Sequence, residues 1–377
     1  MTTTVGILGG GQLARMLALA GAPLGLRFRV VDTSESACAG QVAPLLHADY
    51  TNLAALEDFA REVDVVTFDF ENVPAETAEW LAHRVPVFPN PQALAIAQDR
   101  LEEKQLFRAL GMGTPEFRDI GSRDALERAV RELGTPSVLK TRRLGYDGKG
   151  QHRIRTRDDV DAAWRALGGV PLILEEFVPF ERELSVVAVR GRDGAFAAYP
   201  LTQNWHADGI LSASLAPAPD SDALADDAAA FARALADRLD YVGVFALELF
   251  VRDGRLLANE IAPRVHNSGH WTIEGAWVSQ FENHLRAVLG LPLGATHTRG
   301  HAAMLNFVGE LPTREPVLRE AHAYWHDYGK TPRPGRKVGH ATVTAPDARE
   351  LAEVLEQLGK DLAREGQVAP VVAALRG

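Results

Sequence analysis

Short apolar runs alternate with amphipathic stretches over residues 4–90 of the chain. The runs have the length and β-branched content of buried strands, and the stretches between them have helical periodicity. We predict strands at 4–9, 28–32, 63–70 and 85–89, and helices at 11–25, 52–63, 74–84 and 92–111. Such alternation is typical of a doubly wound parallel sheet with helices on its faces.

The pattern changes after Gly111. Strands are predicted at 136–140, 152–155, 171–178 and 183–191, around one helix at 157–169, which indicates a small α+β module. A helix at 222–241, a hairpin at 242–264 and a long amphipathic helix at 270–290 follow. From about residue 296 the chain favours strands, at 301–310, 321–330 and 338–345, before a final helix. The predicted fold class is therefore mixed, α/β and then α+β.

Composition narrows the function classes. The 377 residues have a net charge of −10, which argues against a broad surface for nucleic acid or anionic membranes. Cys38 is the only cysteine, which excludes an internal disulfide framework and a cysteine-based zinc site. With no signal-peptide pattern and no apolar stretch of about 18 residues, we expect a cytoplasmic protein.

The first glycine-rich turn allows more than one interpretation. The spacing Gly9-x-Gly11-x-x-Ala14 after an apolar strand fits the dinucleotide fingerprint, and Asp32 follows where a ribose-binding acid would lie. An NAD(P)-dependent dehydrogenase is therefore one hypothesis for this chain.

Lysine is rare: the chain has six, and four of them fall in segments 138–151 and 328–340. The first segment, VLKTRRLGYDGKGQ, combines glycines that let backbone N–H groups approach a polyanion with lysines that add charge. It is not a Walker A loop, and a flexible basic hairpin tip is the alternative. In the second segment, prolines and a glycine favour a fixed turn, so Lys330, Arg336 and Lys337 could converge on one anion. The alternative is a basic turn that is simply exposed to solvent.

Carboxylates mark two further sites. Glu175 and Glu176 end an apolar run, where they either bind a nucleoside or are simply solvated. Glu248 lies within an apolar strand and Glu260 ends the next strand, so a buried pair would need a cation, and with Asn259 it would suit Mg²⁺. The alternative is an edge strand with one solvated face.

The turn of this hairpin decides whether the two acids can share a metal. A two-residue turn at Asp253–Gly254 would set Glu248 opposite Asn259, so we predict a three-residue loop that keeps Glu260 on the same face as Glu248. Arg264, His266, Asn267 and His270 follow, and their spacing favours a polar oxyanion pocket over a zinc site.

Together these segments resemble the ATP-grasp superfamily and, within it, the N5-carboxyaminoimidazole ribonucleotide synthase family. The resemblance spans residues 6–340 and lies in GILGGGQLARM, FDFENVP, QDRLEEKQLF, KTRRLGYDGKGQ, EEFVPFERELSV, YPLTQNWH, NEIAPRVHNSGHWT and YGKTPRPGRKVGH. Leu144 stands where a glycine is expected, and Val265 where a proline is expected. In this family the first glycine-rich turn lines the ribonucleotide site and does not bind NAD.

The resemblance implies an ATP-grasp fold with three parts. These are a Rossmann-like pre-ATP-grasp domain (1–97), an ATP-grasp domain (98–295) with a lid module at about 115–178, and a small β-rich C-terminal subdomain (296–377).

The resemblance also implies roles for individual residues. ATP would be bound by Arg100, Lys140, Gly145, Tyr146, Asp147, Gly148, Lys149, Gly150, Gln151, Glu175, Glu176, Phe177, Val178, Glu183, His206, Asn259 and Glu260. Mg²⁺, or Mn²⁺ in its place, would be held by Glu248 and Glu260. The ribonucleotide would be bound by Gln12, Leu13, Glu71, Lys330, Arg336 and Lys337, and catalytic roles would fall to Arg264, His266, Asn267, Asp147 and Lys149.

The implied reaction is ATP- and bicarbonate-dependent carboxylation of 5-aminoimidazole ribonucleotide through carboxyphosphate, in purine biosynthesis, by a homodimer without nucleic-acid or membrane partners. The loop at 145–151 would act as a lid, because carboxyphosphate hydrolyses in water. Three alternatives remain: a sister ligase such as a formate-dependent glycinamide ribonucleotide transformylase or a biotin carboxylase, a dehydrogenase, and a non-catalytic ATP sensor.

Overall fold

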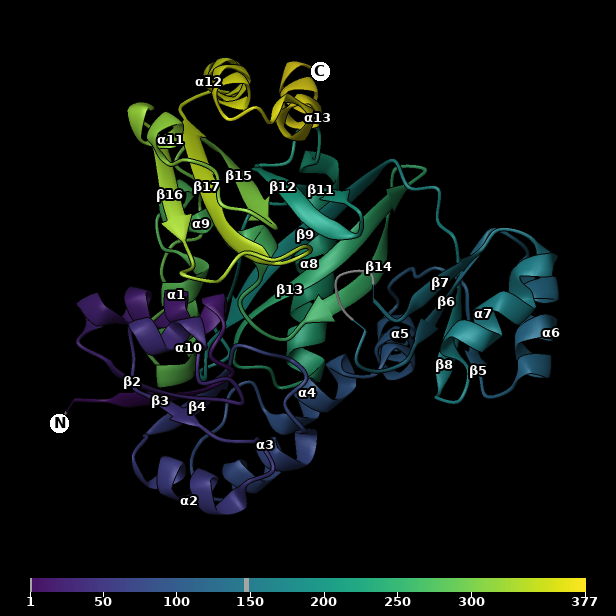
Figure 1. Ribbon diagram of the computed structural model, residues 1–377, viewed down its shortest axis with the longest axis horizontal. Helices are drawn as coiled ribbons and strands as arrows, with labels where there is room; N and C mark the ends of the chain where they lie inside the picture. Colours follow the sequence, from purple (N-terminus) through teal and green to yellow (C-terminus); the bar gives the residue numbers. More distant parts are fainter. Residues whose placement is uncertain (1, 146–148) are drawn as a thin grey trace.

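The computed structural model describes residues 2–145 and 149–377 and is built on three sheets. In Figure 1 the N-terminal sheet lies at the lower left, a small sheet with two helices projects to the right, and a large sheet runs through the middle to the C-terminal helices at the top. No helix within the described residues is long and apolar enough to cross a membrane.

The N-terminal sheet confirms the predicted alternation of strands and helices. Its four strands are parallel, in the order β3 (Leu45–His47), β2 (Arg27–Asp32), β1 (Thr4–Leu8) and β4 (Val65–Phe68). The connecting helices are α1 (Gln12–Gly21), α2 (Leu53–Arg61) and α3 (Ala75–Ala82). The strand predicted at 85–89 is only a single bridge between Val87 and Val66, so this prediction was too long.

The helix predicted at 92–111 is two helices, α4 (Pro91–Ala97) and α5 (Arg100–Ala109). Asp99 separates them, because its side chain accepts from the Leu101 N–H and caps α5. Gln98 also turns its amide away, to the carbonyls of Glu71 and Val73. After the break, α5 packs against strand β14 (Arg255–Ala262).

The projecting module has an antiparallel sheet in the order β5 (Phe117–Ile120), β8 (Leu172–Glu176), β6 (Ser137–Thr141) and β7 (Gln151–Ile154). Two helices pack on it, α6 (Arg123–Leu133) and α7 (Val160–Leu167), and η3 (Arg157–Asp159) precedes α7. Only the second helix was predicted. The apolar face of α6 contains Leu126, Ala129 and Val130 and was overlooked among its charged residues.

The large sheet has nine strands, and every pairing in it is antiparallel. Its path is β14, β13 (Gly243–Arg252), β9 (Arg182–Arg190), β11 (Thr202–Ala207), β12 (Ile210–Ala216), β15 (His301–Val308), β17 (Lys337–Ala345) and β16 (Ala323–Asp327), with β10 (Phe196–Ala198) beside β9. The strand predicted at 183–191 thus belongs to this sheet and not to the projecting module.

The remaining helices cover the large sheet. They are α8 (Asp222–Arg238), α9 (Thr272–Gly275), α10 (Gln280–Leu289), α11 (Glu315–Arg319), α12 (Ala348–Asp361) and α13 (Glu365–Arg376). The short turns η1 (Ala22–Leu24) and η2 (Cys38–Gln41) lie against α1 in the N-terminal domain, whereas η4 (Asn267–Gly269) contacts β9, β11 and β12. The single long helix predicted at 270–290 is broken, because Ser279 caps α10 with its side chain on the Glu282 N–H. The final segment likewise forms two helices, α12 and α13, where one was predicted.

Candidate active site

The glycine-rich turn after β1 is filled by carboxylates of the protein itself. Asp32 Oδ2 accepts from the Gly10 N–H at 2.6 Å, and its Oδ1 accepts from the Ser34 N–H at 2.8 Å. Asp69 Oδ2 accepts from the Ala14 N–H, 2.7 Å away, in the first turn of α1. A Cβ added at Gly11 would lie 3.0 Å from both Asp69 oxygens, so this close approach favours glycine. Asp32 therefore supports the turn, which argues against a dinucleotide site here.

The hairpin of β13 and β14 places Glu248 directly opposite Glu260. The turn is the two-residue Asp253–Gly254, closed by the pair Arg252–Arg255, so the predicted three-residue loop was wrong. The extra residue is in the strand instead: a β-bulge leaves Asn259 between Ala258, which pairs with Leu249, and Glu260, which pairs with Glu248. A bulge sets two residues against one and shifts the side-chain alternation, so both acids face the same side.

The two acids have opposite electrostatic environments. Burial, and then the charge of Glu260, raises the pKa of Glu248 to about 8, and His266 Nε2 lies 3.2 Å from its Oε1. Burial also opposes ionisation of Glu260, but Arg100, whose Nη1 donates to its Oε2 at 2.8 Å, outweighs it and lowers the pKa to about 2. A second cation beside Glu248 would favour its ionised form.

Glu175 is buried at the end of β8 and contacts two lysines. Its Oε2 lies 2.8 Å from Lys140 Nζ on β6 and 3.6 Å from Lys104 Nζ on α5. Burial disfavours the carboxylate, yet these lysines outweigh it and lower the pKa of Glu175 to about 2. Lys104 received no role from the sequence, although its survival in an arginine-rich chain was a usable signal.

The other residues assigned to ATP lie around this edge of the module. Glu176 forms an ion pair with Arg252 at 2.6 Å, Glu183 contacts His206 at 2.9 Å, Arg153 stacks on Phe177, and Val178 is buried. Arg100 Nη2 donates to the Gly145 carbonyl, Gly150 has φ +70°, and Gln151 pairs with Lys140 across β6 and β7. Lys149 is exposed beside them, whereas Tyr146, Asp147 and Gly148 lie outside the described residues. Leu144 has φ +62°, in the left-handed region that favours glycine, which explains why glycine was expected there.

A buried polar network holds the segment after β14. Arg264 is paired with Glu71 of the N-terminal domain. Burial, and then the charges of Arg264 and Lys337, lowers the pKa of His266 well below its usual range, so this ring is neutral.

A chain of hydrogen bonds fixes the orientation of the His266 ring. The Ser268 N–H and Oγ contact its Nδ1 at 3.3 and 2.9 Å, and Ser185 Oγ donates to Ser268 Oγ. Nδ1 is therefore the acceptor, and the Nε2–H faces Glu248. Sequence reasoning missed Ser185 and Ser268, because nothing local distinguishes two serines that meet only in the fold.

Asn267 is held by a side chain that the sequence did not suggest. Its amide exchanges two hydrogen bonds with that of Asn306 on β15, at 2.7 and 3.1 Å, and both side chains are buried. The structure thus brings Arg264 and His266 toward the acidic pair and commits the Asn267 amide to Asn306.

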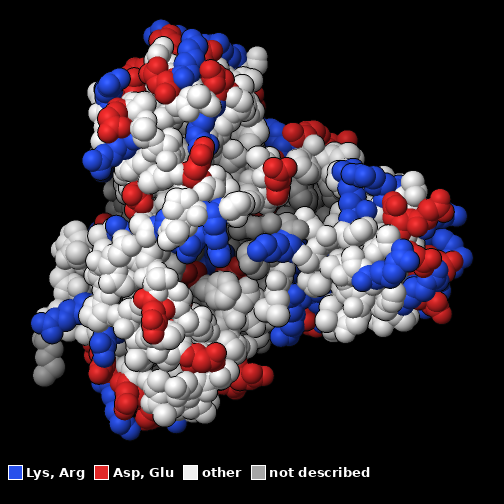
Figure 2. Space-filling view, in the orientation of Figure 1, with Lys and Arg blue, Asp and Glu red and all other residues white. Residues whose placement is uncertain are grey.

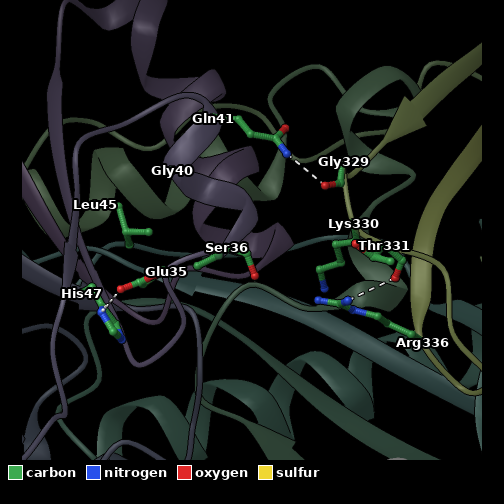
Figure 3. A pocket seen from close by; sticks show the side chains of 11 residues that line it. Glu35, Ser36, Gly40, Gln41, Leu45, His47, Gly329, Lys330, Thr331 and Arg336 are labelled. Carbon is green, nitrogen blue, oxygen red and sulfur yellow. Dashed lines mark hydrogen bonds and ion pairs between the residues drawn. The ribbon is translucent and has the colours of Figure 1, made fainter.

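A cavity of about 530 Å³ lies between the N-terminal domain and the turn before β17. Its lining includes Lys330, Thr331 and Arg336 on one side and Gln41 and His47 on the other (Figure 3). Gln41 Nε2 donates to the Gly329 carbonyl at 2.9 Å across the boundary. Figure 2 shows basic side chains gathered around the hollow where the three parts of the molecule meet.

The residues assigned to the ribonucleotide divide into two groups. Lys330 contacts Gln12 Oε1 at the start of α1, next to the buried Leu13, and Glu71 holds Arg264. Lys330 and Arg336 line the cavity together, and Arg336 donates to the Thr331 carbonyl. Lys337 is not among the lining residues, and its charge acts on Glu248 and His266. The structure therefore brings two of the three predicted cations to one cavity.

Models of three protein families match successive parts of the chain. They are the ribonucleotide synthetase preATP-grasp domain over residues 1–98, the ATP-grasp domain over 105–281, and the phosphoribosylaminoimidazole carboxylase C-terminal domain over 302–354.

Relatives match over most of their length. An N5-carboxyaminoimidazole ribonucleotide synthase from Pseudomonas aeruginosa is 55% identical over 92% of this chain and 96% of its own. The crystal structure of the synthetase from Thermus thermophilus shares 53% identity with a TM-score of 0.91, covering 94% of this chain and 98% of that one. A structure from Aspergillus clavatus, in complex with ADP and 5-aminoimidazole ribonucleotide, shares 33% identity with a TM-score of 0.89, covering 96% of this chain and 99% of that one.

Proposed function

Because the chain belongs to the N5-carboxyaminoimidazole ribonucleotide synthase family, a family of ATP-grasp ligases, we propose that it carboxylates 5-aminoimidazole ribonucleotide with ATP and bicarbonate. The observation that supports this most directly is the pairing of Glu248 with Glu260, flanked by Arg100 on one side and His266 on the other. This arrangement suits phosphoryl transfer, which needs charge neutralisation and positioning more than covalent help.

The acidic pair fits Mg²⁺ that arrives with nucleotide phosphates. Within residues 2–145 and 149–377 we find no cluster of three or more histidine, cysteine or acidic side chains that could hold a metal by itself. Mg²⁺ is usually held by one or two carboxylates together with substrate phosphates, which matches Glu248 and Glu260. When bound, the ion would neutralise charge on the transferring phosphoryl group.

Residues around Glu248 and Glu260 would bind ATP, bicarbonate and the ribonucleotide. Lys140 and Arg100 would contact the ATP phosphates, and the segment Glu175–Val178, with Glu183 and His206, would hold adenine and ribose. Arg264 and His266 would bind bicarbonate, and Asp147 and Lys149 would close over the ribonucleotide amine. Support comes from Arg264, whose raised pKa keeps it charged despite burial: burial opposes its ionisation, but Glu71 outweighs that effect.

The proposed reaction has two steps. A bicarbonate oxygen attacks the γ-phosphorus of ATP and ADP leaves, which gives carboxyphosphate. The exocyclic amine of the ribonucleotide then bonds to the carboxyl carbon of that intermediate, or to CO₂ released from it. Phosphate leaves and the amine loses a proton.

The ribonucleotide would lie at the junction of the N-terminal and C-terminal parts. Its 5′-phosphate suits the cavity of Lys330 and Arg336, and Gln12, Leu13 and Glu71 lie on the N-terminal side of the same region. The assignment of Lys337 to this phosphate remains a prediction.

We also propose a homodimer. Leu19, Leu24 and Val42 are exposed on or beside α1, η1 and η2, and Val42 lines a hollow of about 430 Å³ together with Ala18 and Ala22. Exposed apolar side chains on one part of a surface suit a protein contact. Sedimentation velocity of the wild type and of Leu19→Glu tests it: a dimer that the variant dissociates is the expected result. The cytoplasmic location and the lack of nucleic-acid or membrane partners also remain predictions.

An ADP-release assay tests the activity. Release should require bicarbonate and Mg²⁺ and should rise strongly on addition of 5-aminoimidazole ribonucleotide. Stimulation by glycinamide ribonucleotide with formate, or by biotin, would identify a sister ligase instead. ATP binding without turnover under all of these conditions would indicate a sensor.

A further inference from the structure

One face of α5 presents charged side chains to strand β14. Arg100, Glu103 and Lys104 are spaced three and four residues apart, so they share one face of the helix. Glu103 and Lys104 are almost completely buried, at 2% and 1% exposure. Buried charges are costly unless they are paired and hydrogen-bonded, so their partners indicate what they do.

Those partners are the two peptide groups on either side of Glu260. Lys104 Nζ donates to the Asn259 carbonyl at 2.7 Å, which belongs to the peptide before Glu260. Glu103 Oε1 accepts from the Ile261 N–H at 2.6 Å, which belongs to the peptide after Glu260. With both peptide planes held, the backbone angles of Glu260 are fixed, and so is the direction of its side chain.

The location of these contacts explains why the helix is needed. β14 is the edge strand of the nine-stranded sheet, so part of its backbone has no strand partner. A bulge disturbs the ladder further at Asn259, and buried backbone groups need hydrogen-bond partners. The Glu103–Lys104 pair supplies them at the one place where the strand departs from regular geometry.

We propose that Glu103 and Lys104 are positioning residues that hold the bulge at Asn259 and thereby keep the carboxylate of Glu260 opposite that of Glu248. The inference rests on the proposed function in one respect, that these two acids are the metal ligands. Arg100, one turn earlier on the same helix, contacts the Glu260 side chain directly. The helix therefore fixes both the backbone and the carboxylate of this residue.

Glu103 and Lys104, which together form a clamp on the backbone around Glu260, also contact the proposed ATP site through Lys104. Lys104 shares Glu175 with Lys140, so replacing Lys104 disturbs that ion pair as well as the bulge. Glu103 has no such second role among the described contacts, which makes its variants the cleaner test. Glutamine keeps a side-chain oxygen at this position, so Glu103→Gln can still accept from the Ile261 N–H.

The experiment compares Glu103→Leu, which removes the acceptor, with Glu103→Gln, which keeps it. Lys104→Met removes the donor, and Lys360→Met on the exposed end of α12 is the matched control. Two readouts are independent of turnover: amide hydrogen exchange over residues 256–262 without nucleotide, and the Kd for Mn²⁺ measured by electron paramagnetic resonance in the presence of ADP.

We expect Glu103→Leu and Lys104→Met to speed exchange and to raise the Mn²⁺ Kd by roughly tenfold or more each, as for a lost buried hydrogen bond to a charged group. Glu103→Gln and Lys360→Met should stay within about twofold of wild type in both measurements, since neither removes a hydrogen bond of the clamp. Unchanged exchange and Mn²⁺ affinity in Glu103→Leu would overturn the proposal.

A separate control distinguishes this failure from failure of the proposed function. If Glu248→Gln binds Mn²⁺ as tightly as wild type, the acids are not the metal ligands, and the metal part of both proposals is wrong. If Glu248→Gln weakens Mn²⁺ binding and Glu103→Leu does not, only the positioning role is wrong.

Discussion

Glu248 and Glu260 stand opposite each other on β13 and β14 because one residue, Asn259, is inserted into the second strand. In a regular ladder without a bulge, the Asp253–Gly254 turn would place Asn259 opposite Glu248. Glu260 would then point to the other face of the hairpin. The candidate metal site therefore depends on a local irregularity of one strand, which helix α5 stabilises.

Removing the carboxylate of Glu248 or of Glu260 should strongly lower metal-dependent turnover. We expect Glu248→Gln and Glu260→Gln each to lower the rate of ADP release by roughly a hundredfold or more, because metal charge stabilisation supplies several kcal/mol. Steady-state assays over a range of Mg²⁺ concentrations check this, with Glu353→Gln on the exposed face of α12 as the control. Wild-type rates in either variant would contradict the metal assignment.

Lys330 should affect the ribonucleotide and not ATP. A charge-assisted bond to phosphate contributes roughly 1.5–3 kcal/mol, so Lys330→Ala should raise the ribonucleotide KM by roughly ten- to a hundredfold. The KM for ATP should hardly change. Arg333→Ala, in the same turn but exposed, is the matched control. If only the KM for ATP rises, this turn binds the phosphates of ATP and not that of the ribonucleotide.

The amide pair of Asn267 and Asn306 should behave as one structural unit. Replacing either residue by alanine leaves a buried amide without its partner, at a cost of roughly 1–3 kcal/mol of unfolding free energy. The double variant should lose less than the sum of the two. Thermal unfolding measures this, and the KM for bicarbonate should shift equally in both single variants. A shift confined to Asn267→Ala would instead show direct contact with bicarbonate.

Because of Asp69, the free energy of unfolding should fall as the pH rises from about 4 to 6. Burial raises the pKa of its carboxyl group to about 6, above its usual 3.8, so the folded state holds a proton that the unfolded state releases. Stability linked to that proton is present below about pH 4 and is lost as pH rises through about 6, by roughly 3 kcal/mol at most.

The comparison is made with Asp69→Asn. Relative to wild type, its melting temperature should rise across this pH window and then level off. Asp58→Asn, an exposed site on α2, should give a flat difference, and a flat difference for Asp69→Asn would disprove the raised pKa.

The sequence determined the elements whose pattern is local. Apolar runs in the first 70 residues predicted β1, β2 and β4 of the N-terminal sheet correctly and missed the short strand β3, and the turn chemistry of Asp253–Gly254 was correct as a hairpin signal. The spacing of Gly9 and Gly11 indicated a glycine-rich turn after the first strand, but not which side chains would fill it. Asp32 and Asp69 come from later strands, and only the folded sheet brings them to the turn.

The sequence also contained the bulge, in a form that is difficult to recognise. Leu256, Ala258 and Ile261 all face the core, and the step from two residues to three marks the insertion at Asn259. What no local pattern could give is the choice between an extra residue in the turn and one in the strand. Tertiary structure made that choice, because only packed against α5 do the peptides around Glu260 find Glu103 and Lys104 as partners, residues more than 150 positions away. A backbone irregularity that must be satisfied from outside its own strand is decided by the fold as a whole.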